Sequence, residues 1–548
     1  MHTDADVIVL GAGPVGLTTA LLLAQQQTRV VLVDALTAPS DLPRAISLAD
    51  ESFRIVDGLD LGLLEPMRAE SHLDTGARYF GLRGRLLAES RPAASRNGHP
   101  AKSQFDQPVL EQLLWDAAVE HPMVELLAGH RATDVTQDRD RVVVTVRPEV
   151  VEGSQSVDGS QSSDGGGAER KLTAAYLAAC DGGRSFTREH LGVELKGSTQ
   201  EERWIVIDLE NVPGEPEPFA EFHGNGERPL VYVPGIKGRL RLEFMMLPGD
   251  DPEEIVSPAR VRELCRPYHP GIQDCDVRRA VVYVAHQRVA ETYRVGRVLL
   301  VGDAAHLMPP FSGQGLNAGL RDAANVAWKL RAVLDGVGTD ALLDTYQTER
   351  RAHAARMVRI SHLTGSVVMA RGAAAVARDA LFTLARFVPP VHRYLSSMRF
   401  ITPPKHTEGV VVHPAADVDP RLAAMVGAPL GNPLVENHVG ERTLVDHQLG
   451  AGWSLVVLGA EEAPALSSEW GSTSVHRVVP ATHRATAADV LVDLEGRLAD
   501  ATAPAPWPHV LVVRPDRYVA GVFTPAHEST VLAGLRPFVD LAKTLEKR

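Results

Sequence analysis

The chain opens with a strand, a glycine-rich turn and a helix, and this order constrains its fold more than any other feature. Residues 6–10 form a short apolar run typical of a buried strand, and the Gly-x-Gly-x-x-Gly run Gly11–Gly16 follows it directly. Residues 14–27 have apolar side chains at helical spacing, and residues 29–33 predict a second strand that ends at Asp34. This β-α-β unit has its glycines at the first turn, so it predicts a parallel sheet of the dinucleotide-binding type.

Each residue type in this turn suits the binding of a dinucleotide. Gly11 permits the tight turn, Gly13 lets the backbone approach the pyrophosphate, and Gly16 lets helix and strand pack closely. Pro14 begins the helix, whose N-terminal N–H groups and dipole favour an anion. Asp34 can accept hydrogen bonds from both ribose hydroxyls and would repel a 2′-phosphate, so NADP is not expected in this half of the site.

A second glycine-containing stretch, residues 180–185, follows an apolar run in the middle of the chain. Asp181 and Gly182 give it a carboxylate and a flexible turn, and Arg184 and Arg188 lie close by in the sequence. This combination suits contact with phosphate and ribose. A surface turn held by Asp–Arg pairing explains it equally well.

The third stretch begins where a predicted strand, residues 297–301, ends at Gly302. Asp303 can bond the hydroxyls of a ribityl or ribose chain, and the glycines of Gly313–Gly319 open a helix. The positive end of such a helix stabilises negative charge on a flavin ring. Together the three stretches predict FAD as the cofactor. The residues expected to contact it here are Asp303, Pro310, Gly313, Gly315, Leu316 and Asn317.

The loop ahead of that helix also holds two candidate catalytic residues. Pro310, preceded by Pro309, predicts a stiff wall with few N–H donors beside the flavin ring. His306 lies in the same loop, although a lone histidine there more often packs than catalyses.

Composition excludes several other classes of protein. The chain has 548 residues and a formal charge of −13, which gives no support to nucleic-acid binding or to attraction by an anionic membrane. No apolar run approaches the ~20 residues of a membrane helix, and the N-terminus carries no secretion signal. Three cysteines form neither a disulfide framework nor a metal-ligand spacing, so no metal and a reducing cytoplasm are expected.

The pattern of predicted elements divides the chain into an α/β protein of several parts. A Rossmann-type FAD-binding domain is expected to be discontinuous, at 1–190 and 286–362, because the strand-rich segment 191–285 predicts an inserted antiparallel sheet. A helical segment and linker follow at 363–424, and a small α/β domain at 425–548. The Gly- and Ser-rich residues 152–168 predict a hairpin excursion without a function.

The three stretches together resemble those of the single-component FAD-dependent aromatic hydroxylases, the group A flavoprotein monooxygenases that include para-hydroxybenzoate and phenol hydroxylases. The resemblance covers roughly residues 5–360. It extends to Arg44, where the family has an arginine near the flavin, and to Gln107, where it has a cofactor-contacting glutamine. It is strongest to the branch that hydroxylates 3-(3-hydroxyphenyl)propionate, on Tyr232–Gly235, Glu243–Gly249 and Gly302–Leu330. Residues 425–548 resemble a thioredoxin-like domain without cysteines, for which a packing or oligomerisation role is expected.

This resemblance implies a reaction. NAD(P)H reduces the FAD, oxygen then gives a flavin hydroperoxide, and one oxygen atom is transferred to the ring of a phenol. Arg44, His306 and Pro310 form the candidate catalytic set, and the inserted sheet is expected to cover the flavin. No second dinucleotide motif in a β-α-β context is visible, so NAD(P)H is not expected to have a Rossmann domain of its own.

Residues that face the substrate depend on strand register, because a slip of one residue turns every side chain to the other face. Four polar residues lie on or beside the predicted strands, and each is more often a cross-strand or core residue: Tyr232, Arg241, Tyr283 and His286. Of these, Tyr232, Arg241 and His286 are the candidates for orienting a hydroxyl or carboxylate. Two other functions stay open at this point. One is Baeyer–Villiger or epoxidising chemistry on a polycyclic secondary metabolite, and the other is a non-oxygenating binding or electron-transfer flavoprotein. A monomer or homodimer is expected.

Overall fold

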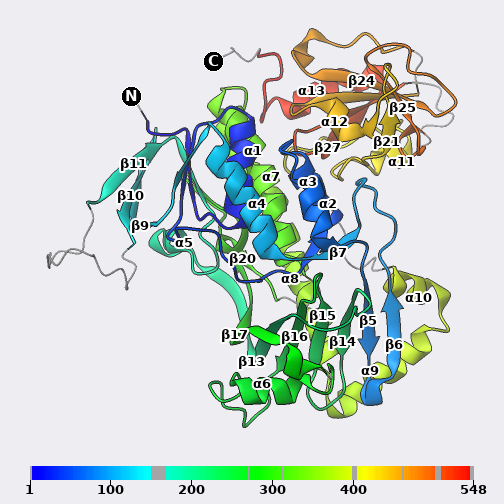
Figure 1. Cartoon of the computed structure of the whole chain (residues 1–548). Coiled ribbons are helices and arrows are strands. Elements are labelled where there is room, and N and C mark those ends of the chain that lie inside the picture. Colours follow the sequence, from blue (N-terminus) through cyan, green and yellow to red (C-terminus); the bar gives the residue numbers. More distant parts are fainter. Residues whose placement is uncertain are drawn as a thin grey trace.

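The computed structural model describes residues 3–149, 168–269, 271–309, 313–397, 404–459, 462–499 and 508–543. Figure 1 shows three regions: a sheet with helices α1, α4 and α7 side by side, a second sheet below it, and a C-terminal sheet domain on the other side of the helices. The predicted hairpin excursion at 152–168 lies almost wholly outside the described residues.

The first strand-helix-strand unit forms as the sequence predicts. β1 (Val7–Leu10) pairs in parallel with β2 (Val30–Val33), and α1 (Pro14–Gln25) connects them. All eight strand residues are buried, which explains why both strands are apolar throughout rather than alternating. The fold prediction for this region is therefore confirmed.

A six-stranded sheet grows from this unit in the order β18-β19-β12-β1-β2-β8. Its other strands are β8 (Val124–Leu127), β12 (Tyr176–Ala179), β18 (Arg294–Val295) and β19 (Val298–Leu300). Helices α1, α4 (Gln107–Glu120) and α7 (Gly315–Leu334) pack together beside it (Figure 1). A sheet of β9 (His130–Gln137), β10 (Val142–Pro148) and β11 (Arg170–Ala174) contributes to the same apolar core.

One sequence prediction in this region is wrong in detail. The alternating residues 141–147 predict a strand and residues 171–180 predict its partner. The structure instead divides the second run into two strands, β11 and then β12. β11 pairs with β10, whereas β12 pairs with β1 and β19 in the central sheet. β12 is apolar and buried throughout, whereas β11 begins with the exposed, charged Arg170 and Lys171, so the composition of the run changes where the chain passes from one sheet to the other.

The second sheet has eight strands in the order β20-β17-β13-β16-β15-β14-β5-β6. Their bounds are β5 (Gly76–Phe80), β6 (Leu86–Ser90), β13 (Leu195–Glu210), β14 (Phe219–His223), β15 (Leu230–Pro234), β16 (Leu240–Met245), β17 (Asp276–Ala290) and β20 (His306–Leu307). Every pairing is antiparallel except that of β14 with β5. Helix α6 (Pro258–Cys265) packs on the face that is built around Leu230 and Leu242.

This sheet also takes in strands from outside the segment expected to be inserted. β5 and β6 come from the N-terminal part of the chain, and β17 continues to Ala290. β14 was not predicted from the sequence. The domain boundaries at 190, 285, 362 and 424 stay a proposal.

A small three-stranded sheet and two helices connect these regions near the N-terminal end of α7. The sheet has the order β3-β7-β4. The elements are β3 (Ser47–Ala49), α2 (Asp50–Asp57), α3 (Leu64–Ala69), β4 (Ser71–His72) and β7 (Lys102–Phe105), with the short α5 (Phe186–His190) farther along the chain.

Long helices then lead to the C-terminal sheet domain. They are α8 (Asp340–Met369), α9 (Gly372–Ala385), α10 (Pro389–Ser396) and the short α11 (Pro420–Ala423). The sequence placed the break between the first two near residue 363, but α8 runs on to Met369.

The C-terminal domain is a seven-stranded sheet in the order β22-β21-β25-β24-β23-β26-β27. Its elements are β21 (Leu434–Glu436), β22 (Arg442–Leu444), α12 (Val445–Leu449), β23 (Ser454–Leu458), β24 (Ser474–Pro480), β25 (Val490–Asp493), β26 (His509–Val513), β27 (Val519–Phe523) and α13 (Glu528–Leu535). The sequence of this domain predicts strands at 453–458 and 509–514, which form as β23 and β26, and it predicts helix-forming stretches between them. The prediction of helix-forming stretches is wrong, because strands β24 and β25 lie there.

A buried ion network fastens this domain to α8. Arg514 donates to both carboxylate oxygens of Glu349, each at 2.8 Å, and Lys329 donates to the same carboxylate at 2.8 Å. All three side chains are fully buried. Burial alone would raise the pKa of Glu349, but the two cations hold it well below its ordinary value.

Among the residues that the structure describes, no helix combines the length and apolar character that a membrane crossing needs. Within the same residues, His, Cys, Asp and Glu side chains form no group of three or more able to hold a metal ion.

Candidate functional site

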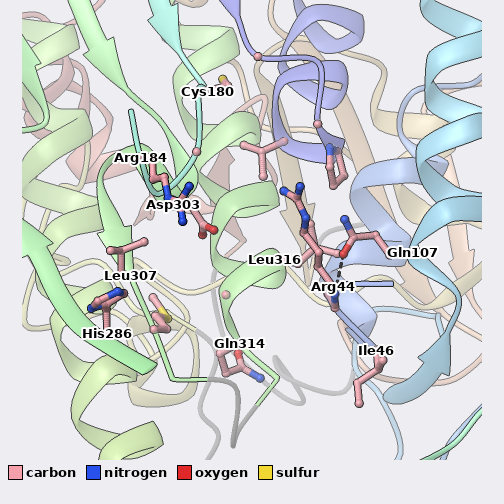
Figure 2. Close-up of a pocket in the computed structure, with 18 of the residues that line it drawn as sticks. Arg44, Ile46, Gln107, Cys180, Arg184, His286, Asp303, Leu307, Gln314 and Leu316 are labelled. Atoms are coloured by element: carbon pink, nitrogen blue, oxygen red, sulfur yellow. Dashed lines mark hydrogen bonds between the residues drawn. The ribbon is translucent and has the colours of Figure 1, made fainter. Parts of the chain in front are cut away.

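A cavity of about 680 Å³ lies between the glycine turns of the six-stranded sheet and one face of the eight-stranded sheet. Its volume falls in the range of roughly 300–1,000 Å³ that is typical of ligand sites. Residues from all three glycine-containing stretches line it, together with side chains of β14, β15, β16 and β17. Figure 2 shows how Arg44, Asp303 and Gln107 project into it from different segments.

The first turn has the geometry of a phosphate cradle. Gly11 has a φ of +97°, and a Cβ on Gly16 would lie 1.8 Å from the carbonyl oxygen of Gly11, so neither position admits a side chain. A Cβ on Gly13 would meet nothing within 4 Å. Helix α1 begins at Pro14 with neither a side-chain cap nor an acidic residue in its first turn. Its N-terminal N–H groups are therefore available to an anion in the cavity.

Asp34 follows β2 and lines the cavity, where the sequence placed it. One carboxylate oxygen accepts the N–H of Ala12 at 2.5 Å, and the other accepts the N–H of Leu36 at 2.7 Å. The carboxylate therefore fixes the glycine turn to the end of β2. Each oxygen has a further lone pair that can accept a ribose hydroxyl.

Asp181 and Gly182 also line the cavity, and the Asp181 carboxylate has a structural partner set. It accepts the hydroxyl of Ser185 at 2.5 Å and the N–H of Thr187 at 2.9 Å, so it caps helix α5. Arg188 donates to the carbonyls of Gly183, at 3.1 Å, and Ala304. The described residues thus show helix capping here rather than the Asp–Arg pairing that the sequence offered as an alternative.

Asp303 projects into the cavity between two segments of the site (Figure 2). Desolvation by the surrounding protein raises the pKa of its carboxyl, and the nearby His306 and Arg44 oppose that rise. Hydrogen bonds from the hydroxyls of a bound ribityl or ribose chain would compensate the carboxylate for lost hydration.

The N-terminal end of α7 forms the next wall. Gly313, Gly315 and Leu316 line the cavity, and α7 begins without a side-chain cap or an acidic residue. Asn317 is buried and does not line it. Its amide oxygen accepts from Ala49 N–H at 2.8 Å, and its amide nitrogen donates to the Gly313 carbonyl at 2.6 Å. It braces the loop against β3, and its assignment as a cofactor contact stays a prediction.

Arg44 and Gln107 lie where the sequence predicted them, at the cavity wall. The side-chain oxygen of Gln107 accepts the N–H of Ala45 at 2.6 Å, which holds the loop that carries Arg44 (Figure 2). Its amide nitrogen donates to Glu111 at 3.1 Å. Gln107 therefore positions Arg44 as well as bordering the site.

His306 is fully buried and does not line the cavity. Its Nε2 lies 2.7 Å from an oxygen of Asp322, and the other oxygen of Asp322 accepts from Arg350 at 2.7 Å. The buried side chains of His306, Asp322 and Arg350 therefore support the chain where β19 ends. Pro310 lies outside the described residues. The catalytic roles of His306 and Pro310 stay predictions.

Strand register decides which sheet residues face the cavity. Val231 pairs with Glu243 and Val233 pairs with Arg241, and all four line the cavity. Tyr232 lies between the two valines, so its side chain points to the opposite face, where it packs in the core beside α6. The structure therefore does not bring Tyr232 to the site.

Arg241 and His286 do reach the cavity wall. Arg241 forms a two-point ion pair with Asp208, at 2.6 and 3.2 Å, and donates to the carbonyls of Pro43 and Arg44. Its guanidinium is thus largely engaged within the protein. His286 contacts the hydroxyl of Thr199 at 3.0 Å, and burial followed by the charge of Arg288 lowers its pKa.

Two chemically important residues of the wall, Glu243 and Lys102, were missed, and a third, Tyr283, was considered from the sequence but not chosen as a site residue. Glu243 is buried, and burial raises its pKa while Arg241 opposes the rise. Tyr283 donates to Glu243 at 3.5 Å, and burial followed by the charge of Glu243 raises its pKa well above the ordinary value. Burial lowers the pKa of Lys102, on β7, to about 8. Spacing offered a signal only for Glu243, which lies two residues from Arg241 and so on the same face.

Comparison with known proteins agrees with this geometry. The model of a family described as "FAD binding domain" matches residues 4–361, and one described as "HcaD C-terminal domain" matches residues 427–537. The chain is 36% identical over 530 residues to a 3-(3-hydroxy-phenyl)propionate/3-hydroxycinnamic acid hydroxylase of Mycolicibacterium smegmatis. That alignment covers 94% of this chain and 90% of the relative.

Several solved structures match nearly the whole chain, and two of them illustrate the likeness. The anhydrotetracycline hydroxylase OxyS of Streptomyces rimosus superposes with a TM-score of 0.72 at 26% identity, covering 98% of this chain and 99% of that one. The flavin-dependent monooxygenase PieE, solved with FAD and substrate, gives a TM-score of 0.75 at 20% identity, covering 97% and 99%. The second likeness concerns the fold alone.

Proposed function

The chain belongs to the family of FAD-dependent aromatic hydroxylases, and from that membership we propose that its substrate is a phenol with a short carboxylate-bearing side chain. One observation carries the proposal: a single cavity joins the glycine turns to a sheet face that presents Glu243 and Tyr283. The hydroxylase of Mycolicibacterium smegmatis, named for 3-(3-hydroxyphenyl)propionate and 3-hydroxycinnamic acid, supports this substrate class.

The residues present fit FAD. Gly11, Gly13, Pro14, Gly16 and Asp34 would hold its pyrophosphate and adenosine ribose, because the turn excludes side chains and the start of α1 lacks a cap. Asp303 would bond the ribityl chain, and the start of α7 would face the ring. The other contacts proposed are Arg44, Gln107, Asp181, Gly182, Pro310, Gly313, Gly315, Leu316 and Asn317. When FAD is bound, it would supply the redox chemistry: NAD(P)H would reduce it, and one atom of O₂ would be transferred to the substrate ring.

The chain's own task at the substrate ring is proton handling. A phenolate is more electron-rich than a phenol, so a base near the hydroxyl favours the reaction. We assign this role to Glu243, whose raised pKa suits a general base and whose carboxylate can take the proton directly or through the hydroxyl of Tyr283. The guanidinium of Arg241 lies 3.8 Å from the Glu243 carboxylate and so helps to hold Glu243 and Tyr283 in place.

One part of the wall is apolar and would exclude water from the bound ring. Ala220, Phe222, Val231 and Val233 present their side chains from β14 and β15. Exclusion of water prevents the unproductive decay of reactive intermediates. An aromatic ring also gains favourable burial against this surface.

The test is oxidation of NADH and of NADPH under air with a panel of phenols. We expect 3-(3-hydroxyphenyl)propionate and 3-hydroxycinnamate to accelerate it and to yield a hydroxylated product in proportion to the oxygen consumed. Oxidation that forms hydrogen peroxide alone with every phenol would refute the proposed function. A ketone panel in the same assay tests the Baeyer–Villiger alternative, for which the cavity offers no particular support.

Further proposals concern the C-terminal domain, the location and the oligomeric state of the protein. The C-terminal sheet domain is proposed to be thioredoxin-like, because its central strands run β24-β23-β26-β27 with one parallel and two antiparallel pairings. All three cysteines of the chain precede it, so it would serve packing rather than dithiol chemistry. Cytoplasmic location and a monomeric or homodimeric state are proposed likewise, with O₂ and a small aromatic molecule as the only partners.

A further inference from the structure

We propose that Lys102 binds the carboxylate of the substrate and thereby orients the phenol hydroxyl toward Glu243. The proposal rests on the proposed function and names a specificity residue for it. It follows from the position of Lys102, from its lack of a protein partner, and from its separation from the proton-handling pair.

Lys102 is the first residue of β7, the middle strand of the small three-stranded sheet. Lys102 and Gln104 lie on one face of β7, and both line the cavity. In the amide orientation that satisfies its neighbours, Gln104 donates to the Pro234 carbonyl at 2.7 Å and accepts from Ala220 N–H at 3.1 Å. This pair of bonds fixes β7 against β14 and β15, and so fixes where Lys102 enters the cavity.

The ammonium of Lys102 has no ion-pair or hydrogen-bond partner among the described residues. Burial is the one cause of its lowered pKa, so no nearby carboxylate compensates the charge. Buried charges in proteins are ordinarily paired, because desolvation costs several kcal/mol. An unpaired ammonium in the wall of a ligand cavity therefore calls for an anionic group on the ligand.

The other cations of the cavity wall are occupied or lie elsewhere. Arg241 is held by Asp208, and Arg131 forms a two-point pair with Glu149. Arg44 and Arg184 lie with Asp303 at the cofactor end of the cavity (Figure 2). Lys102 is thus the cation that the described residues leave for the substrate.

Lys102 and Glu243 lie far enough apart to hold the two ends of one molecule. The carbonyl of Lys102 accepts the N–H of Thr75, which immediately precedes β5, whereas Glu243 is on β16. Strands β14 and β15 intervene, so about three spacings of ~4.8 Å separate β5 from β16. Side chains that reach inward from both ends leave a gap that suits an aryl ring with a short acidic chain.

The experiment compares carboxylated and neutral ligands of the same shape. Dissociation constants of 3-(3-hydroxyphenyl)propionate and of 3-propylphenol are measured on the FAD-loaded protein by the change in flavin absorbance, without turnover. In Lys102→Met we expect affinity for the carboxylate ligand to fall roughly 10- to 100-fold, with little change for 3-propylphenol. Lys102→Arg should restore most of the preference, and Lys171→Met, which removes an exposed lysine on β11, should change neither value.

An equal loss for both ligands, or no loss for either, would overturn the assignment of Lys102. Lys102→Glu gives a second test, because it should reverse the preference in favour of 3-(2-aminoethyl)phenol. Selective binding without hydroxylation of any phenol would refute the proposed function and leave the carboxylate site standing. If the protein hydroxylates phenols but Lys102→Met keeps the preference for the carboxylated ligand, the carboxylate site is refuted and the proposed function stands.

Discussion

Lys102→Met should stabilise the protein in the absence of substrate, because the lysine is retained at a cost to stability. A fall of the lysine pKa from 10.5 to about 8 corresponds to about 3.4 kcal/mol, at about 1.36 kcal/mol for each pKa unit. The side chain is only partly buried and faces a cavity that admits water, so we expect less than half of this, about 1–1.5 kcal/mol. Methionine keeps the length and apolar stem of lysine and removes the charge.

The gain should depend on pH in one direction. The folded protein releases the proton of Lys102 near pH 8, whereas the unfolded chain keeps it to about pH 10.5. Between these values the unfolded state binds more protons, so the stability of the parent protein rises with pH relative to the variant. The advantage of Lys102→Met is therefore complete below about pH 7.5 and vanishes near pH 10.5.

The assay is thermal unfolding of the FAD-loaded proteins at pH 7 and at pH 10, with Lys171→Met as the matched control. We expect the midpoint of Lys102→Met to rise by about 1 °C at pH 7 and by clearly less at pH 10. Saturating 3-(3-hydroxyphenyl)propionate should narrow or reverse the difference, since it stabilises the parent protein more. A lower midpoint at pH 7, or a gain that does not change with pH, would refute the reasoning.

Four further substitutions test other parts of the structure. Gly16→Ala should abolish FAD retention, measured as flavin absorbance per protein, because its Cβ would lie 1.8 Å from a carbonyl oxygen. Asp303→Ala should lower FAD retention, because the hydrogen bonds to the ribityl chain are lost. A normal FAD content in either variant would contradict the assignment of that residue. Glu243→Gln should slow product formation roughly 100-fold or more with the ligand dissociation constant little changed, and unaltered turnover would exclude it as the base. Glu349→Gln removes the ion-pair partner that the buried Lys329 has among the described residues and leaves Arg514 paired with Asp516, so it should cost about 3–5 kcal/mol. The loss would be seen as a lower unfolding midpoint that a merely peripheral contact would not produce.

The cofactor half of the site could be predicted from the sequence because its constraints are local. Gly11 and Gly16 are required by a turn of six residues, and the strand and helix around them have their own periodicities. The same motifs do not separate residues that border the cavity from residues that brace it. Leu316 lines the cavity, whereas the side chain of the next residue, Asn317, holds the loop to β3 by a hydrogen bond. Both lie in the same helical turn, and only the packing distinguishes them.

The substrate half could be predicted only in part, because it depends on contacts between distant segments. Spacing of two residues groups Arg241 with Glu243, but it cannot say whether Tyr232 shares their face until the register of β15 against β16 is known. Lys102 carries no local signal at all. It reaches the cavity because Gln104 fixes β7 against the eight-stranded sheet and because β5, from the N-terminal part of the chain, joins that sheet.

The two halves are joined at the loop that carries Arg44. From the FAD-binding side, Gln107 accepts the N–H of Ala45, and from the substrate sheet Arg241 donates to the carbonyls of Pro43 and Arg44. The loop is thus held between a helix of one region and a strand of the other, and the backbone position of Arg44 depends on both. Because Arg241 also borders Glu243 at 3.8 Å, a change in the charge of the substrate pair acts directly on the group that holds this loop. Arg241 therefore connects the ionisation of the substrate pocket to the position of a cofactor-facing arginine, whether or not it touches the substrate itself.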